Sequence, residues 1–114
     1  MGSLVPPGHF MTDQQYENLL VSTKSGVGMI TMNRPQVLNA LNFDLVRELD
    51  QVLTAMEEDE EIRAIVITGA GNRAFSAGAD IHESRLLSPE ERNQNMEIRS
   101  TNLWRLASYP KPII

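Results

Sequence analysis

Residues 65–81 read IVITGAGNRAFSAGADI, and their pattern indicates the fold class. Together with Ala64 they open on a continuous apolar run, rich in β-branched residues, that is typical of a strand covered on both faces of a sheet. A loop of small residues follows at 69–80, and helix signals lie on both sides of the stretch. A buried-type strand that alternates with helices indicates an α/β protein.

The segments before this stretch fit the same class. Residues 19–23 and 27–32 predict two strands of a hairpin that turns at Ser25-Gly26. From about Asn42 the apolar residues recur every three or four positions, which predicts a helix with Asn42 as its N-cap. The residues expected on the buried face of this helix are Leu45, Leu49, Val52, Leu53 and Met56.

A second helix is predicted after the loop. Ser88 suits its N-cap, Pro89 its first position and Glu91 the reciprocal partner of a capping box. This helix should run to about residue 107, because the residue before Pro110 disfavours helix. Its expected inward residues are Met96, Leu103, Leu106 and Ala107, and the final isoleucines at 113–114 predict the start of another strand.

Composition excludes several classes of protein. The 114 residues, of which 41% are hydrophobic, suit one small domain, and the net charge of −5 argues against a general nucleic-acid binder. The sequence has no cysteine, which excludes disulfides and thiolate-held metals, and we predict no metal site. No apolar run approaches the roughly 20 residues that span a bilayer, so we expect a cytoplasmic protein without membrane contact.

The two ends carry separate expectations. Residues 1–10 have no periodic pattern and are expected to be derived from an expression vector, which leaves 11–114 as the domain. The apolar residues at 113–114 would present unpaired backbone groups, so we expect a longer polypeptide or a second chain to complete the sheet.

The loop at 69–80 allows three functional interpretations. The segment GAGNRA at 69–74 fits the dinucleotide-binding pattern G-x-G-x-x-A, although no helix signal follows it directly. Ser76 is a candidate nucleophile, although no G-x-S-x-G elbow surrounds it and His82 is the only nearby imidazole. The small residues at 77–79 allow backbone N–H groups to approach a ligand such as an acyl thioester. A tight turn that merely needs small residues is the structural alternative.

Three segments, in this order, resemble the enoyl-CoA hydratase/isomerase (crotonase) family. FSAGADI at 75–81 is similar to the family's F-[AS]-A-G-A-D-[IL] segment. MNRP at 32–35 with LNALN at 38–42 is similar to its N-R-P-x-x-x-N-A-L-[NS] segment, and YPKPII at 109–114 to its [FY]-x-K-P-[VI]-[IV] segment. The resemblance covers residues 19–114 and is greatest to bacterial enoyl-CoA hydratases.

This resemblance implies a fold, a ligand and a set of site residues. The fold would be the N-terminal part of a crotonase-like ββα superhelix, assembled as a trimer or hexamer, and the ligand an acyl-coenzyme A thioester. The backbone N–H of Ala77 would donate to the oxyanion of a thioester enolate. The thioester and pantetheine path would be lined by Ala77, Gly78, Ala79 and Asp80. The residues expected along coenzyme A near its adenine end are Val37, Leu38 and Ala40.

The resemblance leaves the reaction open. In the family, the second oxyanion donor is a glycine and the acid and base are glutamates, and all of these would lie beyond Ile114. We expect hydratase chemistry, the syn-addition of water to a 2-enoyl-CoA in fatty acid metabolism, with no cofactor besides the coenzyme A of the substrate. Another family reaction (isomerase, hydrolase or decarboxylase) and a non-catalytic acyl-CoA-binding fragment are the alternatives.

Overall fold

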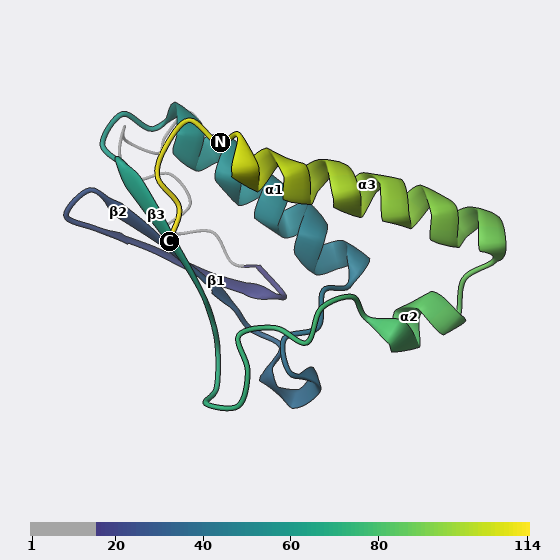
Figure 1. Cartoon of the computed structure of the whole chain (residues 1–114). Coiled ribbons are helices and arrows are strands. Elements are labelled where there is room, and N and C mark those ends of the chain that lie inside the picture. The colour runs from purple at the N-terminus through teal and green to yellow at the C-terminus, as the bar shows by residue number, and fades with distance from the viewer. Residues whose placement is uncertain (1–15) are drawn as a thin grey trace.

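The computed structural model describes residues 16–114, so the expectation for residues 1–10 lies outside the described part of the chain. A three-stranded sheet lies against one side of a helical layer (Figure 1). The elements in chain order are β1 (Leu19–Lys24), β2 (Val27–Met32), the 3₁₀ turn η2 (Pro35–Val37), α1 (Phe43–Glu58), β3 (Ala64–Gly69), α2 (Ile81–Arg85) and α3 (Pro89–Ala107). The α/β class and both predicted long helices are confirmed.

The hairpin forms where the sequence predicts it. Strands β1 and β2 pair antiparallel, with Leu19 opposite Met32 and Lys24 opposite Val27. Both turn residues, Ser25 and Gly26, have positive φ, at 52° and 81°. Two successive positive φ angles give the twist that a two-residue hairpin requires.

Strand β3 joins the hairpin through a crossover. It pairs parallel to β2, from Val27 opposite Ala64 to Met32 opposite Gly69, and α1 provides the connection between the two strands. All five residues predicted for the buried face of α1 are buried. They pack with residues of the sheet and of the turn before β3 into one core, which comprises Leu19, Ile30, Met32, Leu45, Leu49, Val52, Leu53, Met56, Ile62 and Ile65.

The second long helix, α3, differs from its prediction. It begins with the predicted capping box at Ser88 and Glu91, and it ends at Ala107. However, it has no buried residue, and Met96 and Leu103 are exposed. The helix runs alongside α1 (Figure 1), and it touches the core mainly near its C-terminus, through Leu106. The prediction of an inward side chain is therefore confirmed for Leu106 and wrong for Met96, Leu103 and Ala107.

The last residues extend the sheet. The N–H of Ile65 donates to Pro112 O at 2.9 Å, and the N–H of Ile114 donates to Ile65 O at 2.9 Å. These bonds place the 112–114 segment parallel to β3 on its free edge, where the sequence predicts only the start of a strand with unpaired backbone groups. Within residues 16–114, no helix combines the length and the apolar character needed to cross a membrane.

Candidate functional site

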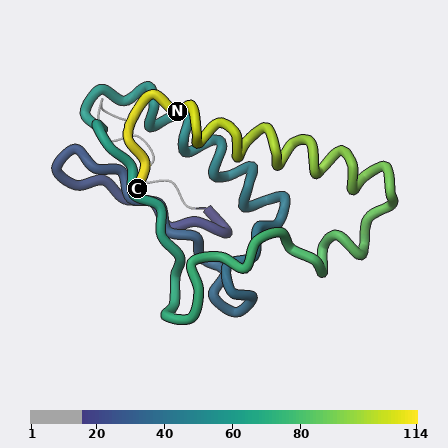
Figure 2. Tube along the Cα trace, in the orientation of Figure 1, coloured from purple at the N-terminus to yellow at the C-terminus, as the bar shows by residue number. Residues whose placement is uncertain are grey.

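Two segments that are distant in sequence meet at one end of the sheet. After β3 the chain runs away from the sheet and returns beside the segment that follows β2 (Figure 2). Leu41 and Ala79 form a parallel bridge between the two segments. In this bridge the N–H of Leu41 donates to Gly78 O at 2.7 Å, and the N–H of Asp80 donates to Leu41 O at 3.2 Å. We call residues 34–42 and 69–80 together the junction.

Asn39 is the centre of the junction. Its side chain is fully buried, and it adopts a left-handed backbone with φ of 54°. Its Oδ1 accepts the N–H of Arg34 at 2.8 Å, and its Nδ2 donates to the carbonyls of Ala70 and Ala74 at 3.0 and 3.1 Å. The amide therefore uses both donors and its acceptor, which is the condition for burying such a group without a large free-energy cost.

The three amides at 77–79 have different partners, and this corrects the prediction for Ala77. The Ala77 N–H donates to Leu38 O at 2.9 Å, so it is already used within the junction. The Gly78 N–H donates to Ser76 Oγ at 3.1 Å. Among the described residues the N–H of Ala79 has no hydrogen-bond acceptor. In a parallel ladder the bridged residue's own N–H points away from its partner, which explains why Ala79 is left free.

The residues beside this free amide are not crowded. Ala79 is exposed, and a Cβ placed on Gly78 would meet no atom within 4 Å. Gly78 has φ of 91°, a left-handed conformation that glycine adopts without steric cost. A small acceptor can therefore approach the Ala79 amide without contact with the Gly78 position.

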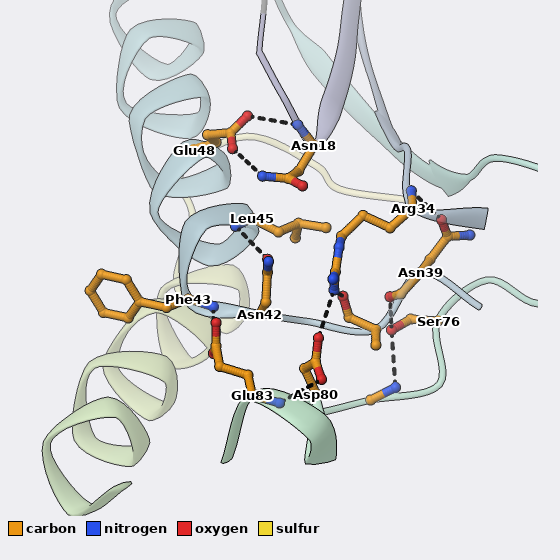
Figure 3. Close-up of polar contacts among 12 residues, drawn as sticks. Asn18, Arg34, Asn39, Asn42, Phe43, Leu45, Glu48, Ser76, Asp80 and Glu83 are labelled. Atoms are coloured by element: carbon orange, nitrogen blue, oxygen red, sulfur yellow. Dashed lines mark hydrogen bonds and ion pairs between the residues drawn. The ribbon is translucent and has the colours of Figure 1, made fainter. Parts of the chain in front are cut away.

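Asp80 connects the junction to the start of α2. Its Oδ1 accepts the N–H of Glu83 at 3.0 Å and so caps α2, and its Oδ2 is 3.0 Å from Arg34 Nη1 (Figure 3). The hydrogen bond from Glu83 N–H has the largest influence on the pKa of Asp80. With the Arg34 guanidinium, it holds that pKa below its usual value against the opposing effect of burial. The Asp80 side chain faces inward and has a structural role, and the prediction that this residue lines a ligand path stays a prediction.

The residues predicted along coenzyme A have different environments. Leu38 lines a hollow of about 120 Å³ together with the loop after β3. Val37 is 41% exposed beside it, whereas Ala40 is buried and offers its carbonyl to Arg34. The residues that line the hollow are Pro35, Leu38, Asn39, Ala70, Gly71, Asn72, Arg73 and Ala74. The roles of Val37, Leu38 and Ala40 in ligand binding remain predictions.

The geometry disfavours the other two interpretations of the loop. The dinucleotide pattern at 69–74 needs a helix directly after it, and α2 begins only at Ile81. Ser76 Oγ donates to Asn39 O at 2.8 Å and accepts from Gly78, so its hydroxyl holds the loop together. No cluster of three or more potential metal ligands occurs in residues 16–114.

The acidic residues near the junction are also structural. Glu83 Oε1 accepts the N–H of Phe43 at 2.9 Å and thereby caps α1 from another element (Figure 3). Glu91 completes the capping box of α3. Both carboxylates therefore accept backbone N–H groups at the starts of helices.

Comparison with known proteins identifies the family. The family model for enoyl-CoA hydratase/isomerase matches residues 22–114. The chain therefore belongs to the enoyl-CoA hydratase/isomerase family, and its fold is the N-terminal part of the crotonase fold. The resemblance read from the three sequence segments is confirmed at this level.

Individual relatives support the assignment. The short-chain-enoyl-CoA hydratase of Clostridium acetobutylicum is 36% identical over 100 residues, which cover 88% of this chain and 38% of that protein. The mitochondrial enoyl-CoA hydratase of Pongo abelii is 55% identical over 62 residues, 54% of this chain and 21% of that protein. The crystal structure of an enoyl-CoA hydratase from Bacillus anthracis superposes with a TM-score of 0.81 at 31% identity, over 85% of this chain and 38% of that one. The chain thus spans well under half the length of these relatives.

Proposed function

We propose that this chain contributes an oxyanion donor to an enzyme that adds water to a 2-enoyl-CoA thioester. The observation that carries the proposal is the free N–H of Ala79, set between the amides of Gly78 and Asp80, which are both hydrogen-bonded. The family membership of the chain supplies the ligand class, since relatives of the chain are named enoyl-CoA and crotonyl-CoA hydratases.

The chemistry that this amide can perform is electrostatic. When water adds to an enoyl thioester, negative charge develops on the thioester oxygen as the enolate forms. A backbone N–H that is fixed in advance stabilises that charge without reorganising, and one such donor contributes about 10²–10³ in rate. The junction fixes the Ala79 peptide through bonds on both of its neighbours, so this donor is preorganised.

Other parts of the proposal rest on the family alone. We propose that the acid and base groups come from residues outside this chain segment, that coenzyme A enters only as part of the substrate, and that the enzyme is a cytoplasmic homo-oligomer. The hollow at Leu38 is the proposed location for part of the coenzyme A moiety.

The first experiment measures the reaction. The full-length protein is mixed with crotonyl-CoA, and the absorbance of the conjugated enoyl thioester is followed over time. We expect the absorbance to fall as hydration removes the double bond. A protein that binds the thioester in calorimetric titration and leaves the absorbance unchanged would support a different family reaction or a non-catalytic binder.

The second experiment identifies the donor. Replacing Ala79 by its α-hydroxy analogue exchanges one N–H for an oxygen and leaves the side chain intact. We expect kcat to fall about 10²–10³-fold with little change in Tm. The matched control is the same exchange at Ala77, where the lost bond to Leu38 should lower Tm and leave most of kcat. The reverse pattern would return the donor role to Ala77.

A further inference from the structure

We propose that Arg34 and Asp80 form a clamp that positions the Ala79 amide for catalysis. This inference rests on the function proposed above. The Arg34 Nη1 donates to Ala40 O at 2.6 Å and to Asp80 Oδ2 at 3.0 Å, so one guanidinium nitrogen holds both segments of the junction. Figure 3 shows Arg34 reaching from the first segment to Asp80 on the second.

The two anchor points adjoin the bridge that orients the amide. Ala40 immediately precedes Leu41, and Asp80 immediately follows Ala79. The bridge itself consists of only two bonds, from Leu41 to Gly78 and from Asp80 to Leu41. Ala79 belongs to no strand and to no helix, so no longer ladder fixes its peptide plane. The clamp therefore supplies a constraint that regular secondary structure would supply elsewhere.

Burial makes the clamp sensitive to the loss of either partner. The side chains of Arg34 and Asp80 are 15% and 11% exposed. Removing one partner leaves the other charge largely buried and unpaired, which is unfavourable enough to move the chain that carries it. If Asp80 moves towards solvent, the adjoining Ala79 peptide turns with it. An error of about 1 Å in such a group costs on the order of 10²-fold in rate.

The same burial makes Arg34 a positioning residue and not a catalytic one. Its guanidinium is directed at Ala40 and Asp80 inside the junction, whereas Ala79 is exposed. We therefore expect the loss of the clamp to lower kcat more than it raises KM.

The test compares Arg34→Met and Asp80→Asn with Arg105→Met in the full-length protein. Asparagine keeps an oxygen for the Glu83 N–H, so Asp80→Asn preserves the cap of α2. If Arg34→Met does not fold, the kcat and KM of Asp80→Asn still test the proposal. Arg105 is the matched control, because it forms partly buried ion pairs with Asp50 and Glu57 that tie α3 to α1. We expect both clamp variants to lower kcat by about 10–100-fold with KM within about threefold, while Arg105→Met lowers Tm and leaves kcat within about threefold.

Two more measurements separate positioning from general loss of structure. The double variant Arg34→Met/Asp80→Asn should lower kcat no more than the more damaging single variant does, since the pair acts as one unit. The infrared stretch of a ¹³C-labelled thioester carbonyl, bound as a non-reactive acyl-CoA, should move towards its frequency in water in both clamp variants and not in Arg105→Met. Clamp variants with kcat and carbonyl frequency like wild type, or an equal loss in Arg105→Met, would overturn the clamp. A wild-type protein that does not hydrate crotonyl-CoA would instead refute the proposed function.

Discussion

The core between α1 and the sheet and the junction at the end of the sheet are held together by different forces. The core buries ten apolar residues, each of which touches several others, so its free energy is spread over many replaceable contacts. The junction contains three buried or nearly buried polar side chains, Arg34, Asn39 and Asp80, whose bonds are specific and few. In this chain we therefore expect the core to contribute to stability alone, and the junction to contribute both to stability and to the geometry of the Ala79 amide.

Substitution of Asn39 should give the largest effect and test this separation directly. Asn39→Ala leaves Ala70 O, Ala74 O and the Arg34 N–H without their partner and places alanine in a left-handed conformation. We expect the free energy of unfolding to fall by about 3–5 kcal/mol in chemical denaturation and hydratase activity to be lost.

The matched control for Asn39→Ala is a cavity in the core. Leu53 is 1% exposed, and Leu53→Ala should cost a similar 2–5 kcal/mol. The activity of each folded molecule should nevertheless persist at low temperature, because the junction remains intact. An equal loss of activity per folded molecule in both variants would show that the two regions are not separable.

Two glycines on neighbouring strands, Gly69 beside the junction and Gly28 beside the core, allow the two regions to be compared by adding a single methyl group. A Cβ on Gly69 would lie 2.3 Å from Phe75 O and 2.7 Å from Asn39 Nδ2, so backbone would have to move. A Cβ on Gly28 would lie 2.6 Å from Met56 Sδ, which a flexible side chain can relieve. We expect Gly69→Ala to cost about 2–3 kcal/mol and Gly28→Ala about 1 kcal/mol in thermal unfolding. A larger cost at Gly28 would contradict the view that the core adapts and the junction does not.

The sequence predicted the core more completely than the junction, for a physical reason. Periodicity marks residues such as Leu45 and Met56, because burial of a helix face repeats every three or four positions. The hydrogen bonds of Asn39 and Arg34 to the loop after β3 join residues more than 30 positions apart and leave no local pattern. The choice between Ala77 and Ala79 depends on the direction of each N–H, which is set by the bridge to Leu41 and not by residue type.

The surface of α3 shows another limit of prediction from the sequence. The capping box at Ser88 was predictable because its partners are three residues apart. The inward face was not, because apolar spacing alone does not reveal which element covers a helix. Only contacts near the end of α3, such as those of Leu106 and Tyr109, connect it to the core in the described residues.

The pH dependence of stability should differ between the regions. Burial raises the pKa of Tyr109 to about 12, with a further contribution from Glu57, and its hydroxyl donates to Leu53 O under α1. The protonated phenol is the form that the fold favours. The stability that this preference contributes is therefore complete below pH 10, the usual pKa of tyrosine, and is lost as the pH rises towards 12. We expect Tm to fall less steeply at alkaline pH in Tyr109→Phe than in the wild type. The absorbance change that accompanies ionisation of the Tyr109 phenol near pH 12 should also be absent from this variant.

The junction should respond at the acid side instead. The pKa of Asp80 is lowered, chiefly by the Glu83 N–H, so its contribution is present above the ordinary pKa of a carboxyl group and is lost as the pH falls through the lowered value. Asp80→Asn should therefore make Tm fall less steeply as the pH is lowered, and it should leave the dependence of Tm on alkaline pH unchanged. An unchanged acid limb would show that the Asp80 carboxylate does not stabilise the junction.

The smallest expected effect compares two helix N-caps of similar chemistry. Asn42 Oδ1 accepts the N–H of Leu45 at 2.9 Å beside the junction, and Ser88 Oγ accepts the N–H of Glu91 at 3.1 Å on the exposed start of α3. Loss of either cap, in Asn42→Ala or Ser88→Ala, should cost about 1 kcal/mol, measured by urea denaturation. Only Asn42 adjoins Leu41, so Asn42→Ala alone should also lower kcat, whereas Ser88→Ala should leave it unchanged. Equal kcat in the two variants would mean that the geometry of the bridge between Leu41 and Ala79 does not depend on the N-cap of α1. The contacts of Arg34 and Asp80 would then determine the position of Ala79.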